Sequence, residues 1–271
     1  MAPGASAASF GLRRRMPLRL ISTDFDGTIF TEFGTPAIPP MLIRLIGNLQ
    51  RRGVVWVINT GRDLGSLMET LTRAELSAHP DALVLVEREI YVRKDTQYLP
   101  MQSWNAACTR DHQELFARVA PDLPKLGERL QSRHRATFYE DPFSPVCVLA
   151  GSVKDADAIQ AELEAYASGI ANLSVVRNDV YIRFCHAAYN KGTALAEIAR
   201  RLKVTPEETL AAGDHYNDLP MLDPIRAKAL VAPANAIPEV QEKVRAAGGY
   251  VSHRPTGEGV CLGLEYYLER L

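Results

Sequence analysis

The sequence has no excess of either charge and no long apolar run. Its 271 residues include 31 basic and 32 acidic side chains, which leaves a formal net charge of −1. Because affinity for nucleic acid or for an anionic membrane surface depends on a basic field, this balance predicts neither kind of partner. No stretch approaches the roughly 20 apolar residues of a membrane-spanning helix. The composition therefore argues against a nucleic-acid-binding protein and against a helical membrane protein.

Cysteine is also scarce. The four cysteines lie far apart and form no Cys-x-x-Cys pair: Cys108, Cys147, Cys185 and Cys261. This pattern is typical of reduced, buried thiols and predicts a cytoplasmic protein. Residues 1–17 are rich in small side chains, contain Arg13–Arg15 and lack both acidic residues and a secretory apolar core. We expect a disordered tail there; a transit peptide and a start assigned upstream of Met16 are the alternatives.

The first clear element ends in two closely spaced carboxylates. The apolar run Leu18–Ile21 predicts a buried strand, and Gly27 marks the turn that follows it. Asp24 is therefore expected at the carboxyl edge of a strand, where open α/β sheets place their chemistry. Asp24 and Asp26 would repel one another without a neighbouring positive group, and Mg²⁺ suits such oxygen ligands. The pattern alone also fits the metal-binding Asp-x-Asp of glycosyltransferases, or a plain turn.

A strand–helix–strand unit follows. An amphipathic helix over residues 41–52 leads to a continuous apolar strand over residues 54–58. A right-handed crossover would place Thr60, at the end of that strand, beside Asp24. A hydroxyl followed by the Gly61 amide at a helix start can cradle a phosphate, although Thr60 could equally cap the helix.

The middle of the chain has a different pattern of predicted strands and helices. Alternating strands are interspersed with helices, including a charged helical pattern over residues 111–133 and a hairpin around Asn178-Asp179. Such a mixture predicts an α+β layer inserted into the first domain, and we place it at residues 84–187. The core would then consist of residues 18–83 and 188–271.

The first pattern returns after the insertion. Lys191 and Gly192 open an amphipathic helix, and a short apolar strand ends at Asp214, four residues before Asp218. These two carboxylates could face one cation or could cap the next helix. Lys191 is better explained as a phosphate ligand than as a solvated surface lysine, because it precedes a glycine and a helix start.

Together these strand ends supply what phosphoryl transfer requires. One carboxylate can attack phosphorus and others can hold Mg²⁺, while a hydroxyl, backbone amides and an ammonium group neutralise the charge on the phosphoryl oxygens. The residues concerned are Asp24, Asp26, Thr60, Gly61, Lys191, Asp214 and Asp218.

The order of these pieces resembles the haloacid dehalogenase-like (HAD) phosphatases across nearly the full chain. The four motifs of that superfamily correspond to Asp24-Phe25-Asp26-Gly27-Thr28, Thr60-Gly61-Arg62, Lys191-Gly192 and Gly213–Asp218. The resemblance implies a Rossmann-like parallel α/β core, with Asp24 as a nucleophile that forms an aspartyl-phosphate and Asp26 as general acid and then general base. It further implies phosphate binding by Thr60, Gly61 and Lys191, and Mg²⁺ binding by Asp24, Asp26, Asp214 and Asp218.

An insertion between the second and third motifs resembles the type-IIB cap (C2B), an α+β domain found in Cof-like sugar phosphatases and sucrose-phosphatase-like enzymes. Pro80-Asp81-Ala82, Glu89-Ile90-Tyr91 and Arg135–Tyr139 are similar to the sucrose-phosphatase branch. Two departures stand out: Glu87-Arg88 replace small residues, and His215-Tyr216 fill the middle of the fourth motif. Bulky charged groups would change the sugar pocket, which argues against sucrose 6-phosphate itself.

We therefore predict an Mg²⁺-dependent phosphatase that hydrolyses a small phosphomonoester, with sugar phosphates as the preferred class. A phosphomutase of the same superfamily and a catalytically silent binding or regulatory member are the alternatives. The intact Asp24, Asp26 and Asp214 favour an active enzyme, and metal-transporting ATPases carry Thr where this chain has Asp26. Each candidate substrate contact could also be an ordinary solvated charge or polar group: Arg62, Glu87, Arg88, Arg135 and Asn217.

Overall fold

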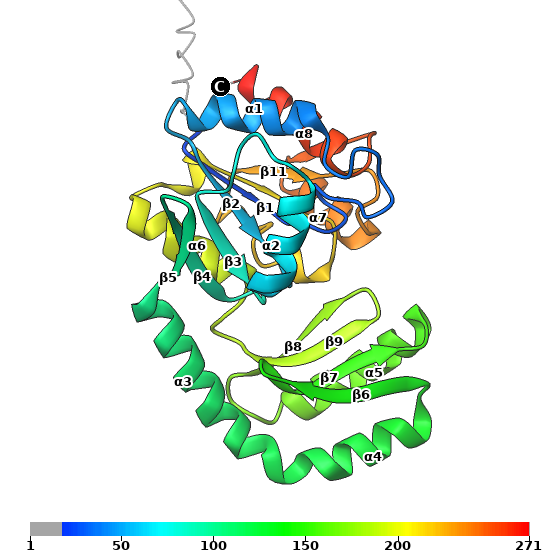
Figure 1. Ribbon diagram of the computed structural model, residues 1–271. Helices are drawn as coiled ribbons and strands as arrows, with labels where there is room; N and C mark the ends of the chain where they lie inside the picture. Colours follow the sequence, from blue (N-terminus) through cyan, green and yellow to red (C-terminus); the bar gives the residue numbers. More distant parts are fainter. Residues whose placement is uncertain (1–17, 271) are drawn as a thin grey trace, which may run out of the picture.

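The computed structural model describes residues 18–270, which form two β-sheets and the helices that cover them (Figure 1). The larger sheet has eight strands in the order β12-β11-β10-β1-β2-β3-β4-β5, and the smaller has four in the order β6-β7-β9-β8. The tail expected at residues 1–17 lies outside the described residues. Within residues 18–270, no helix combines the length and the apolar character needed to cross a membrane.

Strand β1 (Leu20–Thr23) lies near the middle of the larger sheet, and all of its residues are buried. It pairs in parallel with β2 (Val55–Asn59) on one side and with β10 (Thr209–Ala212) on the other. The parallel part of the sheet continues outward through β3 (Ala82–Leu85), β11 (Ala229–Ala232) and β12 (Tyr250–Val251). The predicted α/β class with a parallel-rich sheet is confirmed.

Alternate side chains of the central strands pack under opposite layers of helices. Ile21 and Trp56 belong to one hydrophobic cluster, which also includes apolar residues of α1 (Pro40–Gln50), α2 (Leu64–Arg73) and α8 (Thr256–Leu268). Leu20 and Val57 belong to a second cluster, which is shared with α6 (Lys191–Leu202) and α7 (Pro238–Ala246). Because both faces are covered, the polar strand ends meet only at the carboxyl edge of the sheet.

The inserted layer begins later in the chain than expected. Strand β4 (Glu89–Lys94) pairs antiparallel with β3, and β5 (Gln97–Pro100) pairs with β4, so both belong to the larger sheet. The alternation at residues 89–93 suggested a separate layer, but it reflects an antiparallel edge of the core sheet with one better-covered face. We therefore move the proposed start of the inserted layer from residue 84 to residue 102.

The inserted layer, residues 102–186, has a hydrophobic cluster of its own that includes Leu130, Ile159 and Phe184. Its antiparallel strands are β6 (Ala136–Asp141), β7 (Ser144–Ala150), β8 (Leu173–Asn178) and β9 (Tyr181–His186). Its helices are α3 (Gln102–Val119), α4 (Leu123–Arg133) and α5 (Val153–Ala167). The single helical run expected over residues 111–133 is interrupted at Ala120–Asp122, because Pro121 lacks a backbone donor.

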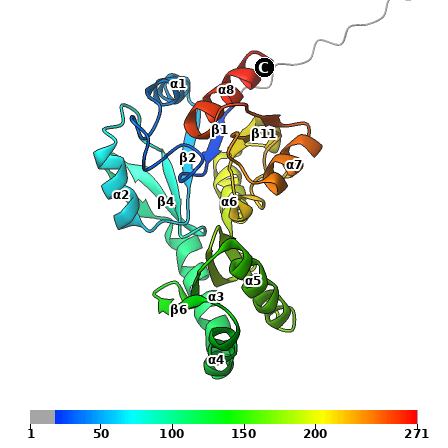
Figure 2. The same cartoon turned by 90° about the vertical axis from the view of Figure 1, so that its right-hand side faces the viewer.

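The sheet of the inserted layer faces the core, and α4 and α5 cover its other side (Figure 1). Helix α3 runs from the core to the far end of the layer, which lies below the carboxyl edge of the larger sheet in both views (Figure 2). The predicted hairpin is present: β8 and β9 are antiparallel, with Leu173 opposite His186 at one end and Asn178 opposite Tyr181 at the turn. This arrangement places one face of the small sheet opposite the strand ends that carry the candidate site.

Candidate active site

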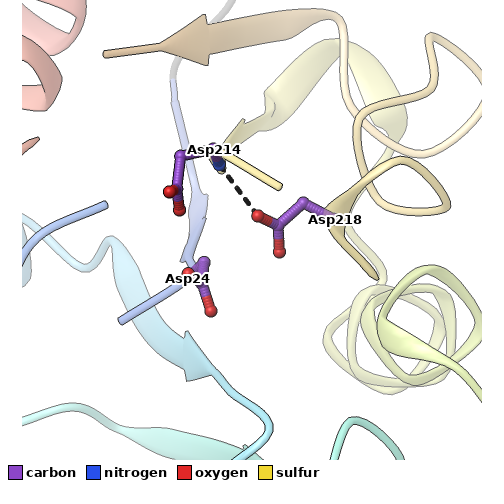
Figure 3. A group of neighbouring side chains, drawn as sticks. All are labelled: Asp24, Asp214 and Asp218. Carbon is purple, nitrogen blue, oxygen red and sulfur yellow. Dashed lines mark hydrogen bonds between the residues drawn. The ribbon is translucent and has the colours of Figure 1, made fainter. Parts of the chain in front are cut away.

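The carboxyl edge of the larger sheet gathers the predicted strand-end residues. Asp24 follows β1, Thr60 follows β2 and Asp214 lies just beyond β10. The N–H of Asp24 donates to the carbonyl oxygen of Ala212 at 2.9 Å, which extends the parallel ladder as far as the aspartate. One carboxylate oxygen from each of Asp24, Asp214 and Asp218 lies within 4.8 Å of the other two (Figure 3). Three acids that are far apart in the sequence thus form one cluster.

Lys191 is a fully buried cation among these acids. Its Nζ lies 2.6 Å from Oδ1 of Asp24 and 2.6 Å from Oδ1 of Asp218. Asn190 caps α6 by accepting hydrogen bonds from the N–H groups of residues 192 and 193, which fixes the start of the helix. Burial by itself would lower the pKa of Lys191, but the charges of Asp218 and Asp24 outweigh it and raise the pKa. The ammonium group is therefore held charged beside Asp24.

The surroundings of Asp24 and Asp214 raise the pKa of both carboxyl groups. Burial raises the pKa of both Asp24 and Asp214, and the charge of Asp218 adds to the effect; the pKa of Asp214 rises to about 7. The Thr28 hydroxyl donates to Oδ1 of Asp214 at 2.6 Å. Three carboxylates around one ammonium group leave a surplus of negative charge, which a hard divalent cation with oxygen ligands would neutralise. The donor set fits Mg²⁺.

Asp218 has little capacity left for a metal. Its Oδ1 binds Lys191, and its Oδ2 accepts hydrogen bonds from the N–H groups of Asp214 at 2.8 Å and of His215 at 3.0 Å. These bonds fix the loop that carries Asp214. Asp218, predicted as a metal ligand, is accordingly better placed to orient Asp214 and Lys191 than to bind a cation directly.

Asp26 points away from the acidic cluster and toward Arg62. Its Oδ2 accepts from Nε of Arg62 at 2.8 Å, and its Oδ1 accepts from Nη2 at 2.6 Å. The guanidinium carbon also lies 5.3 Å from the ring centroids of both Phe25 and Phe30. Arg62, which we predicted as a substrate contact, thus has a carboxylate of the same site as its partner. The side chain of Asp26 is not part of the three-acid cluster, so any contribution to metal binding there would have to come from its backbone carbonyl.

The loop after β2 is built from Thr60 and Gly61. Thr60 is buried, and its hydroxyl accepts a hydrogen bond from the N–H of Arg62 at 3.2 Å. Thr60 does not cap the following helix, because Oδ1 of Asp63 accepts from the N–H of Ser66 at 2.9 Å and performs that role. Helix capping by Thr60 is therefore wrong, and phosphate binding by Thr60 stays a prediction.

Glu87 and Arg88 lie in the turn between β3 and β4 and are both buried, so neither is a solvated charge on a cap strand. Oε2 of Glu87 accepts from Nη2 of Arg183 at 2.9 Å, and Oε1 accepts from Nδ2 of Asn217 at 2.9 Å. Arg88 donates from Nη2 to the carbonyl oxygen of Phe143 at 2.6 Å. The turn therefore connects the core to the inserted layer at two points.

The remaining candidate, Arg135, is exposed at the start of β6, which is the edge strand of the small sheet. Within residues 18–270 its side chain makes no hydrogen bond or ion pair with the other site residues. Its predicted contact with substrate stays a prediction.

Two residues of the junction, Arg183 and His215, were not predicted. Arg183 lies on β9 and donates to the carbonyl oxygen of Val86 at 2.8 Å as well as to Glu87. A ring nitrogen of His215 accepts from the N–H of Asp179, at 3.2 Å, at the tip of the β8–β9 hairpin. Arg183 lies within a strand of alternating side chains, and the residues around it do not distinguish it from other strand residues. The sequence therefore does not indicate that it pairs with Glu87. The substitution of His215 into the fourth motif was visible, but the hairpin it meets was not.

The chain is similar to known phosphatases over almost its whole length. A model of the family "sucrose-6F-phosphate phosphohydrolase" matches residues 17–268. A phosphoglycolate phosphatase from Methanopyrus kandleri is 28% identical over 259 residues, which cover 93% of this chain and 98% of that protein.

Two solved structures show the same fold. The sucrose-phosphatase of Synechocystis sp. PCC6803, in complex with sucrose and phosphate, is 18% identical with a TM-score of 0.71, covering 93% of this chain and 98% of that one. A phosphatase of the haloalkanoate enzyme superfamily from Bacteroides thetaiotaomicron is 20% identical with a TM-score of 0.63, covering 96% of this chain and 99% of that one. The family match spans almost the whole chain and confirms the resemblance: the protein belongs to the sucrose-6F-phosphate phosphohydrolase family of HAD-type phosphohydrolases.

Proposed function

We propose that the protein hydrolyses a small phosphomonoester, with Mg²⁺ bound, through a phosphoryl group carried transiently on Asp24. The observation that supports this most strongly is the position of Asp24 at the end of β1, where its Oδ1 lies 2.6 Å from the buried ammonium group of Lys191. A carboxylate held beside a fixed cation can meet a phosphate whose negative charge would otherwise repel it.

In the first half-reaction a carboxylate oxygen of Asp24 bonds to phosphorus while the bond to the leaving oxygen breaks. Asp26 gives a proton to that oxygen, and the alcohol departs. In the second half-reaction Asp26 accepts a proton from water, the water oxygen bonds to phosphorus, and inorganic phosphate leaves Asp24 free again. Asp26 thus acts as acid and then as base. Thr60, Gly61 and Lys191 hold the phosphoryl oxygens throughout.

Asp24 and Asp214 would hold the metal, with the backbone carbonyl of Asp26 as a further ligand and Asp218 holding the loop of Asp214. When bound, Mg²⁺ neutralises the surplus carboxylate charge and the charge on the phosphoryl oxygens. Burial and the neighbouring acid raise the pKa of Asp214 to about 7, and a cation there would keep this carboxylate ionised.

A sugar phosphate is our proposed substrate class. The family takes its name from a sugar phosphate, sucrose 6F-phosphate, and the structure of the Synechocystis relative contains sucrose and phosphate. On this chain the core-facing side of the small sheet carries Tyr139 and Leu149, both close to half exposed, on the same face as Arg183. An apolar and aromatic platform with polar groups beside it suits a sugar ring.

The four cysteines are free and buried, which supports our proposal of a cytoplasmic location.

The test is hydrolysis of p-nitrophenyl phosphate and a panel of sugar phosphates by the purified protein, with and without Mg²⁺. We expect metal-dependent release of inorganic phosphate. A phosphomutase would instead move the phosphoryl group between positions of a sugar bisphosphate and release little phosphate, and a silent binding protein would release none.

A further inference from the structure

Most buried cations of the described chain have a carboxylate partner. Four basic side chains in residues 18–270 are at least nine-tenths buried: Arg88, Arg177, Arg183 and Lys191. Arg177 pairs with Asp157 at 2.6 Å, Arg183 with Glu87 at 2.9 Å, and Lys191 with two aspartates. Arg88 is the exception, since within residues 18–270 no carboxylate lies within ion-pair distance of it.

The partners of Arg88 leave part of its guanidinium group unused. Nη2 donates to the carbonyl oxygen of Phe143, and the group lies 5.9 Å from the ring centroid of the same residue. Nη1 is buried and has no hydrogen-bond partner. A buried guanidinium without an anion is costly, and an unused buried donor calls for a group that the protein itself does not supply.

A second unused donor lies in the same junction. Nε of Arg183 is also buried without a partner, and so is Oδ1 of Asn217, although both residues bind Glu87 through other atoms. Arg88 and Arg183 are close enough that the charge of Arg183 lowers the pKa of Arg88, after the larger effect of burial. Glu87 pairs with Arg183 but not with Arg88, so the charge of Arg88 has no ion-pair partner within residues 18–270.

The junction lies beside the phosphate-binding loop. The N–H of Glu87 donates to the carbonyl oxygen of Thr60 at 2.9 Å, and the N–H of Val86 donates to that of Arg62 at 3.0 Å. A Cβ added at Gly61 would lie 3.4 Å from Oε1 of Glu87. On the other side, Phe143 and Arg183 belong to the inserted layer. The part of a substrate that extends from the phosphate toward the inserted layer would therefore meet these two arginines.

We propose that Arg88, together with Arg183, forms a subsite for a carboxylate on the leaving group of the substrate. This inference rests on the proposed phosphatase function and narrows it to phosphorylated hydroxy acids or sugar acids. A carboxylate accepts hydrogen bonds from two guanidinium groups and supplies the missing negative charge. Glu87 has a supporting role, because it fixes Arg183 and Asn217 around the subsite and leaves Arg88 without an ion-pair partner.

Matched substrates test the proposal on the unaltered protein. 2-Phosphoglycolate and 2-hydroxyethyl phosphate differ only by a carboxylate in place of a hydroxymethyl group, and 6-phosphogluconate differs from glucitol 6-phosphate in the same way. We expect kcat/KM to be about tenfold or more higher for the carboxylated member of at least one pair, mainly through a lower KM, as a charged hydrogen bond would give. The absence of a preference for the carboxylated member in both pairs would overturn the inference.

Variants connect the preference to Arg88. Arg88→Gln should reduce the carboxylate preference by about tenfold, and Arg88→Lys, which keeps the charge, should retain part of it. Arg177→Gln is the matched control, because it also removes a buried arginine but one that pairs with Asp157; its substrate ratio should match that of the original protein. A ratio unchanged in Arg88→Gln would contradict the proposal. If Arg88→Gln does not fold, the comparison of Arg88→Lys with the original protein decides. Failure to hydrolyse every substrate would instead contradict the proposed phosphatase function.

Discussion

Arg62 holds both carboxylate oxygens of Asp26 at once, through Nε at 2.8 Å and Nη2 at 2.6 Å. The two residues are 36 positions apart and come from the first and second motifs. Thr70 also accepts from Nη1 of Arg62, at 2.7 Å, so the guanidinium is fixed from the side of α2. A bidentate pair of this kind sets the direction in which the carboxylate faces as well as its distance.

Arg62→Lys should therefore impair catalysis more than binding. Lysine keeps the charge but cannot contact both oxygens, so Asp26 loses its fixed direction. We predict a drop in kcat of about tenfold or more, in the range of a misplaced acid–base group, with a smaller change in KM. Steady-state kinetics on the best sugar phosphate measure this. An unchanged kcat would mean that Asp26 does not depend on Arg62.

Asp26→Ala separates the acid–base residue from the nucleophile. Positioned proton transfer contributes about 10²–10⁴-fold, and we expect kcat for a sugar phosphate to fall by that factor. The loss in the first half-reaction should be smaller with p-nitrophenyl phosphate, because its leaving group departs without a proton. Rapid-quench kinetics with both substrates test the difference. Equal losses in that step would indicate that Asp26 has no role in protonating the leaving group.

Removal of the metal should abolish activity. The cluster of Asp24, Asp214 and Asp218 contains only oxygen donors and should favour Mg²⁺ over the softer Zn²⁺. We expect EDTA to reduce turnover to background and excess Mg²⁺ to restore it, as followed by phosphate release. Asp214→Asn should raise the Mg²⁺ concentration needed for half-maximal turnover, whereas Glu162→Gln, a control within the inserted layer, should leave it unchanged. Full turnover in chelated buffer would be inconsistent with the metal site.

Stability should decrease in acid because of His112. Burial lowers the pKa of His112 from 6.5 to about 3, while its Nδ1 donates to Cys108 O at 2.8 Å and its Nε2 accepts from the N–H of His186 at 3.0 Å. In the unfolded chain His112 is protonated as the pH falls below about 6.5, whereas in the folded chain it is protonated only near pH 3. The free energy of unfolding therefore decreases as the pH falls between these values.

Between pH 7 and pH 5 this single group should lower the free energy of unfolding by about 2 kcal/mol. Urea denaturation at the two pH values measures the change. The His112→Gln variant should lose about 2 kcal/mol less over the same interval, since it has no titrating group at this position. Equal losses in both proteins would show that His112 does not cause the effect.

The sequence predicts the core of this protein well because its signals are local. Continuous apolar strands that end in Asp24, Thr60 or Asp214 indicate a parallel sheet, and parallel strands bring their carboxyl ends to one edge. The structure brings Asp24 and Asp214 into one cluster as expected, and the family match confirms the HAD resemblance. The proposed start of the insertion moves by 18 residues because alternation at residues 89–93 suits an edge strand of either sheet, and β4 and β5 belong to the larger one.

The junction between core and inserted layer could not be predicted in the same way. Glu87 and Arg183 are 96 positions apart, and their ion pair depends on how the two sheets pack. A buried charge in a turn looks the same in a sequence as a solvated one. The interruption at Pro121, by contrast, was available from the sequence, because proline inside a helical pattern breaks its hydrogen bonds.

The proposed mechanism depends most on Asp24, and its most direct test is to identify the residue that is phosphorylated during turnover. The Asp26→Ala variant should hydrolyse the phosphoenzyme slowly, so acid quenching after mixing with p-nitrophenyl phosphate and Mg²⁺ should trap it for peptide mapping by mass spectrometry. The account predicts a phosphoryl group on the peptide that contains Asp24, and neither label nor turnover in a well-folded Asp24→Asn protein. Continued turnover in Asp24→Asn, or a phosphoryl group on another residue, would contradict it.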